Sequence, residues 1–348
     1  MLVRWSFELL DYQDRKKDML RGVTGGHAEI VAQSPLGGSG ALSFDVSDPS
    51  LVPDFMSDRV RATFHKGTES WPFGVFMFSQ PKERHSEFGV VGYDITLLTK
   101  MNVVQEDALD ARLVLPAGTP VVQAAVDLLT STGETRIAVT PSPSVLAGPL
   151  TFEAATSKLE VINTLLTSIG YWALRCDRSG LFRIEPYTRP EDRPPAHEFE
   201  HGEASLHFPD WAREQDLTSV PNKVILIGSA ASDEVPLVGI ARDTDPASPF
   251  SYQNRAKGSQ PGRWIPHKET GVEAESQAVI DQLAERKLRD LRDRVASLKV
   301  DHAMLPLEAH DLVGFTPEDG RRRLATVQRM RFNFDEFTDV QAEWREVG

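Results

Sequence analysis

The chain has 348 residues, 40% of them hydrophobic and 26% charged, and a formal net charge of -13. This length allows two or three domains with their own cores, and no apolar run approaches the roughly 18 residues of a transmembrane helix. The acidic balance argues against a protein that wraps nucleic acid, because such a protein needs clustered positive charge. The first residues mix charged and apolar side chains without a cleavage site of small residues, so we expect no signal peptide.

Residues 1–110 are predicted to form antiparallel β-structure. Apolar side chains recur at every second position in short segments separated by turn residues, a pattern typical of a small barrel or sandwich. The alternating positions include Trp5, Phe7, Leu9, Leu42, Phe44, Val46, Val60, Ala62, Phe64 and Tyr93. The glycine-rich turn at residues 37–40 lacks the Lys-Ser/Thr of a phosphate-binding loop and precedes a strand, so we interpret it as an ordinary loop.

Residues 111–192 are predicted to form a small α+β unit, and a connector leads into its first helix. Thr119 is expected to cap a helix with Pro120 in its first position, where the missing N–H of proline is harmless. Gly133 ends this helix, and a strand follows at residues 137–139. A loop rich in Pro and Ser leads to a second helix, and the unit closes at the Pro-rich linker of residues 188–196.

The second helix and the hairpin after it occupy residues 157–187. Ser157 and Glu160 have the spacing of a capping box, and Gly170 stands where a left-handed residue ends a helix. Cys176 is the single cysteine, which excludes an intrachain disulfide, and we expect it to pack in the interior rather than to react. The predicted apolar positions are Leu159, Ile162, Leu166 and Ile169 in the helix and Trp172, Leu174, Cys176, Phe182 and Ile184 on either side of a turn at residues 177–180.

Residues 193–348 predict a second β-domain with a loop and a helix inserted at about residues 233–298. A short apolar strand at residues 223–228 precedes a polar stretch at residues 243–270, and a loop of that length is normally functional, interfacial or mobile. The helix is predicted at residues 273–298, with a Glu285–Arg289 pair on its surface. We expect its stripe to pack on the protein's own sheet. The stripe consists of Ile280, Ala284, Leu288, Leu291, Val295 and Leu298.

Further strands are predicted around residues 312–315, 324–334 and 340–347. The fold class predicted from these periods is α+β, mostly β.

Residues 197–201 fit the zinc-peptidase pattern His-Glu-x-x-His. That chemistry needs a helix, so that both imidazoles bind one metal ion with the glutamate as base. Here His197, Phe199 and His201 alternate as in a strand, where residues four apart stand about 13 Å from each other. His207 is a possible third ligand, but the Phe208-Pro209 that follows predicts the end of a strand. We therefore assign no metal site, and a zinc peptidase stays an alternative.

Other polar and aromatic residues carry no catalytic pattern. Four acidic residues could offer oxygen ligands to calcium but lack the EF-hand spacing, so we interpret them as solvated loops: Asp233, Glu234, Asp243 and Asp245. The basic run at residues 321–323 follows a turn and predicts a hairpin tip rather than a nucleic-acid site. Three aromatic residues could stack on sugars: Trp211, Tyr252 and Trp264. We assign no catalytic, cofactor-binding or metal-binding residue and expect no cofactor.

The stretch at residues 158–187 contains a helix, Gly-Tyr-Trp, a strand, an Asp-x-x-Gly turn and a closing Pro-Tyr. In this order it resembles the tail hub proteins, also called minor tail proteins, of long-tailed phages that infect actinobacteria, a family similar to the baseplate hub of contractile tails. Further phrases that resemble the family are residues 221–223, residues 245–249, and residues 305–307 followed by Asp311. None of these phrases is a catalytic signature, so the shared order carries the resemblance.

The resemblance implies a structural protein, not an enzyme: a homotrimeric ring in which two β-barrel-like, tail-tube-like domains flank the α+β unit. Such a ring would join the sixfold tail tube or distal-tail ring to a threefold spike or fibre. The tape-measure protein and genomic DNA would pass through its lumen without specific binding. The protein would lie at the tail tip of the virion, after assembly in the host cytoplasm.

The polar stretch at residues 243–270 and the helix that follows are then expected to meet neighbouring subunits or the distal-tail ring. A carbohydrate-binding adhesin of the same tail tip, using the aromatic residues, is the alternative.

Overall fold

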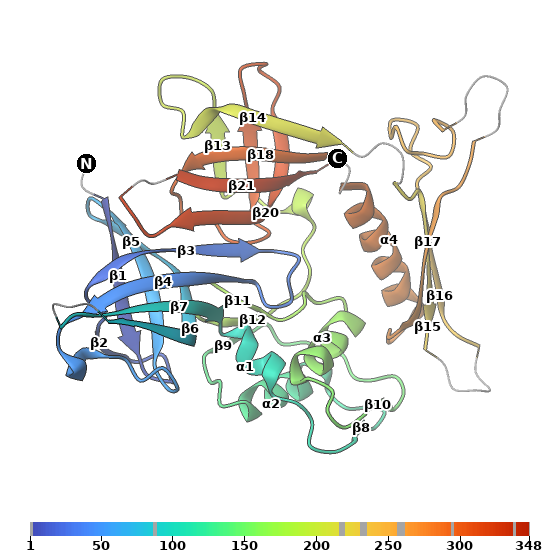
Figure 1. The fold of residues 1–348 in the computed structure, drawn as a ribbon. Helices are drawn as coiled ribbons and strands as arrows, with labels where there is room; N and C mark the ends of the chain where they lie inside the picture. The colour runs from blue at the N-terminus through green and yellow to red at the C-terminus, as the bar shows by residue number, and fades with distance from the viewer. Residues whose placement is uncertain are drawn as a thin grey trace.

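The computed structural model describes residues 3–85, 89–215, 220–229, 235–255, 262–293, 296–336 and 339–347. The protein is mostly β with few helices, as predicted, and its long strands form one sheet that includes both ends of the chain (Figure 1). None of the helices in the described parts of the chain has the length and apolar content that a membrane crossing requires.

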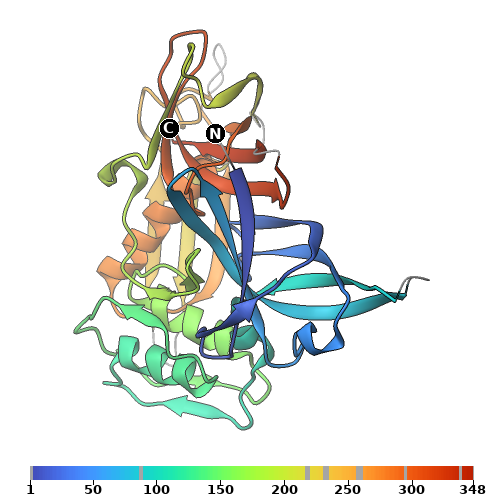
Figure 2. The same cartoon turned by 90° about the vertical axis from the view of Figure 1, so that its left-hand side faces the viewer.

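The N-terminal part of the sheet consists of the strands predicted from alternating apolar residues. They are β1 (Val3–Leu10), β2 (Lys16–Met19), β3 (Val23–Val31), β4 (Gly38–Val46), β5 (Arg59–Lys66), β6 (Glu69–His85) and β7 (Val91–Thr99), with a 3-10 turn at Pro49–Leu51. The predicted inward residues are buried, among them Phe44, Val60 and Phe64. The far end of the β6–β7 hairpin projects from the body (Figure 2).

The C-terminal part of the sheet also follows the predicted strands. They are β13 (His197–Glu200), β14 (His207–Gln215), β18 (Ala296–Ala303), β19 (Leu312–Thr316), β20 (Arg323–Asn333) and β21 (Asp339–Glu346). We predicted that a strand ends near Phe208-Pro209, but β14 continues through both residues. The register of β14 against β18 shifts between His207 and Trp211. Such an irregularity on an edge strand tolerates a proline, because the missing N–H need not enter the ladder.

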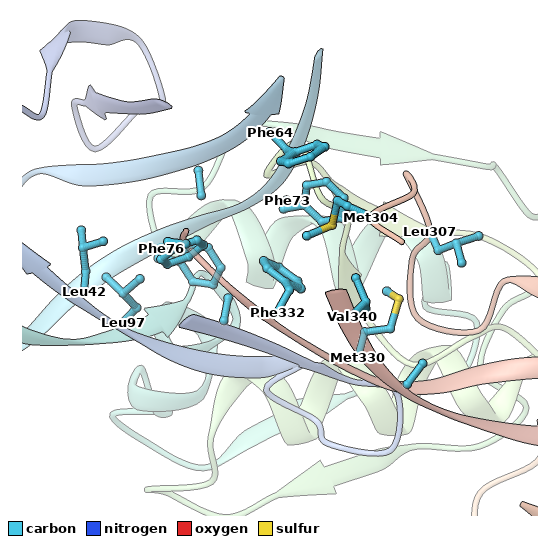
Figure 3. Packing of buried hydrophobic residues seen from close by; sticks show 14 of the residues in the cluster. Leu42, Phe64, Phe73, Phe76, Leu97, Met304, Leu307, Met330, Phe332 and Val340 are labelled. Carbon is cyan, nitrogen blue, oxygen red and sulfur yellow. The ribbon is translucent and has the colours of Figure 1, made fainter. Parts of the chain in front are cut away.

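The pairing of β20 with β3 joins the two ends of the chain. Phe332 lies opposite Ala28 and Arg331 opposite Glu29, and the strand order is β14-β18-β21-β20-β3-β4-β7-β6-β5-β1-β2. Buried side chains cross this seam, since Phe332 belongs to the same apolar cluster as Phe73 (Figure 3). Two barrel-like domains were predicted, but the pairings of the described residues close neither half into a barrel.

The predicted α+β unit lies below this sheet in Figure 1. Its elements are α1 (Met101–Glu106), β8 (Leu113–Leu115), α2 (Val121–Ser131), β9 (Ile137–Val139), β10 (Leu150–Phe152), α3 (Lys158–Ser168), β11 (Arg175–Cys176) and β12 (Phe182–Ile184). The predicted order of helix, strand, helix and hairpin is confirmed. Helix α1 was not predicted, and neither was the pairing of β8 with β10, because these segments were interpreted as a connector and a loop. Pro120 is the N-cap of α2 rather than its first residue, and the Thr119 hydroxyl donates to the Pro116 carbonyl instead of capping the helix.

Helix α3 begins and ends as its sequence predicts. The Ser157 hydroxyl accepts a hydrogen bond from the Glu160 N–H (3.2 Å). At the other end Gly170 adopts a φ of 75°, a left-handed conformation that costs glycine little. The N–H of Gly170 bonds to Thr167 and that of Tyr171 to Leu166, which is the Schellman arrangement. These bonds turn the chain directly into the Trp172 hairpin.

The inserted unit is a small sheet covered on one face by α4 (Gln277–Asp293). Strand β15 (Lys223–Gly228) lies between β16 (Val238–Arg242) and β17 (Pro266–Val272). Ile280, Ala284, Leu288 and Leu291 pack on this sheet, so for these four residues the expectation that the helix stripe covers the protein's own sheet is confirmed. Val295, which was also predicted to belong to the stripe, lies outside the described residues. Gly239 permits the close approach of α4, because a Cβ there would lie 2.4 Å from the Ile280 carbonyl oxygen.

Two details of the inserted helix were predicted wrongly. The helix is shorter than predicted, because β17 continues to Val272 and Leu298 belongs to β18. Leu298 fits both periods, and in the structure it alternates with Ala296 and Val300 as a buried strand residue. Glu285 and Arg289 do not pair with each other. They contact Arg189 (3.6 Å) and Glu191 (3.7 Å) of the Pro-rich linker.

Candidate functional site

A buried ionic cluster fixes the α+β unit to the N-terminal strands. The Lys100 ammonium lies 2.6 Å from Asp14 and 2.8 Å from Glu134. The Arg59 guanidinium contacts the same two carboxylates at 2.9 and 2.6 Å. The side chains of Lys100, Asp14 and Glu134 are 0%, 1% and 3% exposed. They come from the end of β7, the turn between β1 and β2, and the segment after α2.

The cluster is saturated with hydrogen bonds and therefore structural. Arg136 adds a contact of 3.1 Å to Asp14, and Lys100 also donates to the Gly180 carbonyl of the hairpin turn (3.0 Å). Although burial opposes the charged form, Lys100 and Arg59 hold the pKa of Asp14 below its usual value. A carboxylate held in this way cannot serve as a base near neutral pH. The cluster fixes the orientation of the unit relative to the sheet.

A second junction surrounds Trp172, in the stretch that carries the resemblance. The Arg286 guanidinium of α4 lies 3.9 Å from the ring centre of Tyr187 and 5.1 Å from that of Trp172. His310 packs against Trp172 with ring centres 4.8 Å apart. A cation against two aromatic faces is favourable where water is excluded. The inserted helix, the hairpin and the segment before β19 thus meet at one aromatic pair.

One further phrase of the resemblance, residues 305–307 followed by Asp311, lies in a segment that contacts the same hairpin. Arg178 donates to the Pro306 carbonyl and contacts Glu308 at 3.3 Å, while Arg193 donates to the His310 carbonyl (2.9 Å). A cavity of about 310 Å³ lies between this junction and residues of β3 and β6, and is lined in part by Cys176. Burial raises the pKa of the Cys176 thiol to about 12, so it is not a nucleophile near neutral pH.

Two buried histidines are expected to make the protein less stable in acid. Burial lowers the pKa of His302 to about 4, and burial with nearby arginines lowers that of His310 to about 3. The unfolded chain, with histidine pKa values of about 6.5, then binds more protons below that pH. The contribution of the two neutral histidines to the free energy of unfolding is therefore fully present above about pH 6.5 and is lost as the pH falls toward 4. From pH 7 to 5, His302 should cost about 2 kcal/mol of unfolding free energy.

Urea unfolding at pH 7, 6 and 5 tests this prediction. His302→Gln should reduce the pH dependence by that amount, whereas the control His85→Gln, at a side chain that is 72% exposed, should leave it unchanged. Equal pH dependence in all three proteins would contradict the role given to His302.

The zinc-peptidase pattern lies on a strand, as its alternation predicts. Residues 197–200 form β13, paired in parallel with β19, and Glu198 contacts Arg322 at 2.6 Å. His207 is buried and its Nδ1 lies 2.8 Å from the Phe208 carbonyl oxygen. The helical geometry that the peptidase hypothesis requires is absent from this segment. Among the described residues, no group of His, Cys, Asp and Glu could hold a metal ion.

The remaining candidates have partners within the protein. Asp243 is buried against Arg292 (3.4 Å), which corrects its interpretation as a solvated loop residue, while Asp233 and Glu234 lie outside the described residues. Trp211 donates to Glu318 (3.1 Å). The three aromatic residues proposed for sugars, Trp211, Tyr252 and Trp264, are all half-buried.

The predicted hairpin tip is confirmed, since residues 321–322 follow a turn between β19 and β20. No sequence pattern predicts the ionic cluster, because its members are far apart in the chain and each resembles a surface residue.

Sequence comparison finds no match, either to a family model or to a curated protein. Structure comparison finds similar folds over nearly the whole chain. The tail protein from Neisseria meningitidis MC58 has a TM-score of 0.69 at 12% identity, covering 99% of this chain and 97% of that one. The 43 kDa tail protein of prophage MuSo2 from Shewanella oneidensis has a TM-score of 0.64 at 12% identity and covers 98% of both.

A third similar structure is the E. coli c3393 protein, a component of the type VI secretion system that is described as similar to the T4 bacteriophage tail proteins gp27 and gp5. Its TM-score is 0.55 at 12% identity, with 94% of this chain and 74% of that chain covered. Identities this low show a common fold. The chain therefore shares its fold with these three proteins.

Proposed function

We propose that this protein is a structural hub subunit of a phage tail tip, forming a homotrimeric ring. The observation that best supports this proposal is the pairing of β20 with β3, which places the N-terminal and C-terminal strands in one sheet. Each chain thus carries two β-regions side by side. Three copies around one axis would present six such regions, enough to match a sixfold tail tube or distal-tail ring on one side. The threefold symmetry of the ring would match a spike or fibre on the other side.

The buried contacts between the units favour a protein that keeps one conformation in the tail over one whose units move apart. The ionic cluster and the Trp172 junction fix the α+β unit and the inserted helix to the sheet. In the proposed ring the tape-measure protein and the genomic DNA pass through the lumen. The net charge of -13 would keep DNA phosphates from binding to its wall. The protein would be a virion component of the tail tip, assembled in the host cytoplasm. The assignment to phages of actinobacteria stays a prediction, because the similar structures described above come from Neisseria, Shewanella and E. coli.

Electron microscopy of the purified protein, with its native mass measured over a range of concentrations, tests the proposal. We expect rings with threefold symmetry, a central hole, and three times the chain mass of 38.7 kDa. A monomer at every concentration, also in the presence of isolated tail tubes, would contradict the homotrimeric hub. A glycan array run in parallel distinguishes the adhesin, which would show saturable binding without ring formation.

A further inference from the structure

The inserted unit has an apolar sheet face that nothing in the described protein covers. Side chains alternate between the two faces of a strand. On β16, Gly239 and Ala241 point toward α4, so Val238 and Ile240 point away, and each of these two is 40% exposed. On β15, Val224 and Leu226 are buried under α4, which leaves Ile225 and Ile227 half-buried on the opposite side. Four β-branched side chains therefore form a patch, which we call the outer face.

The strand registers bring these four side chains together. Ile225 lies opposite Ile240, and Ile227 lies opposite Val238. On the other side of β15, Lys268 and Thr270 of β17 lie opposite the same two isoleucines. Cross-strand neighbours on one face stand about 5 Å apart, so the patch is contiguous. Figure 1 shows α4 between this sheet and the rest of the molecule, with the outer face on the far side.

Basic side chains border the outer face. One row of the sheet is formed by Arg242, Lys223 and Pro266, and the next contributes Lys268. Within the described parts of the chain, none of the three basic groups forms an ion pair. The outer-face positions of these three strands include no acidic residue, since Glu269 belongs to the inner face, where it pairs with Lys287 of α4 (2.7 Å). The outer face is thus apolar at its centre and positive at its border, in a chain whose net charge is -13.

We infer that the outer face binds an acidic surface of a second copy of this chain, as one of the subunit contacts of the ring; this inference rests on the proposed homotrimer. Contiguous exposed apolar patches that are rimmed by polar residues are found at protein–protein interaction sites. Self-pairing of the outer face about a twofold axis would place Lys223, Arg242 and Lys268 against their own copies, which like charges oppose. A contact between this positive face and a different, negative face avoids that repulsion. Heterologous contacts of this kind form a ring when the rotation from one copy to the next closes.

The binding position is fixed because α4 is anchored. Arg286 holds the helix at Tyr187 and Trp172, and Glu285 and Arg289 hold it at the linker. The attachment of α4 to the body, chiefly through Arg286, sets the angle at which the outer face is presented, and a contact that closes after three copies requires a defined angle.

Native mass over a concentration series tests the inference with Ile240→Asp and with the double variant Arg242→Glu/Lys268→Glu. We expect the protein concentration at half-assembly to rise at least about tenfold in each, because a carboxylate at the patch centre is desolvated on binding and reversed border charges repel an acidic surface. The matched control is Val114→Asp, at a side chain that is 55% exposed on β8. Its assembly should equal that of the wild type, and circular dichroism and thermal unfolding establish that each variant is folded.

The outcomes separate this inference from the proposed function. A trimer that Ile240→Asp and the double variant leave unchanged would overturn the inference and leave the hub intact. A wild-type protein that never self-associates would overturn both.

A crosslinking measurement does not depend on the fold of a disruptive variant. In a Cys176→Ala background, Ile240→Cys carrying a photoreactive maleimide should crosslink to an acid-rich segment of another copy. Crosslinks restricted to the same chain in an assembled ring would contradict the inference.

Discussion

Replacement of Lys100 by methionine is expected to lower the free energy of unfolding by about 3–5 kcal/mol, because it leaves two buried carboxylates short of a cation. Lys100 is fully buried and contacts both Asp14 and Glu134. Arg59 and Arg136 remain in the cluster, so the two carboxylates would keep part of their positive counter-charge. The Gly180 carbonyl would lose its hydrogen-bond donor. Urea unfolding followed by circular dichroism measures the loss.

The control for this change is Lys299→Met, at a paired lysine on the surface. The Lys299 side chain is 54% exposed in its pair with Glu214, and removal of an exposed pair changes stability by less than about 1 kcal/mol. A loss of similar size in both variants would show that the buried cluster contributes no more than a surface pair. A destabilised Lys100→Met protein that also exposes the α+β unit to proteolysis would support the role of the cluster in fixing that unit.

Phe332→Ala is expected to cost about 3–5 kcal/mol of unfolding free energy, the usual range for a phenylalanine deleted from a core. Phe332 lies on β20 at the seam and is 2% exposed. Its ring centre lies 5.6 Å from that of Trp5, in a stacked arrangement, and 5.1 Å from that of Phe73, edge to face. The variant would open a cavity between the N-terminal and C-terminal strands, where collapse is limited by strands on both sides.

Thermal unfolding monitored by calorimetry checks this prediction, with Phe208→Ala as the control because Phe208 is 43% exposed. We expect a single transition in the wild type, since both halves share one core, and a lower, broader or divided transition in Phe332→Ala. If the variant unfolds at the wild-type temperature in one step, the seam does not couple the two halves.

Local chemistry made several elements of this protein predictable. The cap at Ser157, the stop at Gly170 and the alternation in β4 and β5 each depend on side chains within a few residues of one another. Capping, turns and strand alternation are effects of that range, so the residues involved specify them wherever the segment lies. The strand character of residues 197–200 was predictable in the same way, and it removed the geometry that a zinc site would need. Where two periods fit equally well, as for Leu298, the local pattern was ambiguous.

Contacts between distant residues could not be predicted from these patterns. Glu285 was expected to pair along its own helix, yet its partner is Arg189 of the linker. Asp14, Lys100 and Glu134 show no pattern in the sequence, although their side chains meet in the interior. Asp243 looked solvated because it lies among polar loop residues, but the C-terminal part of α4 places Arg292 against it. In each case the partner is chosen by the way whole elements pack, which removes water from some charges and leaves others exposed.

The sequence by itself determined which segments become strands and helices, where several of them end, and the order of motifs that resembles the phage hub family. Only the tertiary structure decided that β3 pairs with β20, and that the two β-regions form one sheet instead of separate barrels. It also decided that no described part of the chain covers the outer face of β15, β16 and β17. The physical reason is the range of the forces involved. Dihedral preferences and alternation act between neighbours in the chain, whereas the choice of a partner strand depends on which edges and apolar faces remain after every other element has packed.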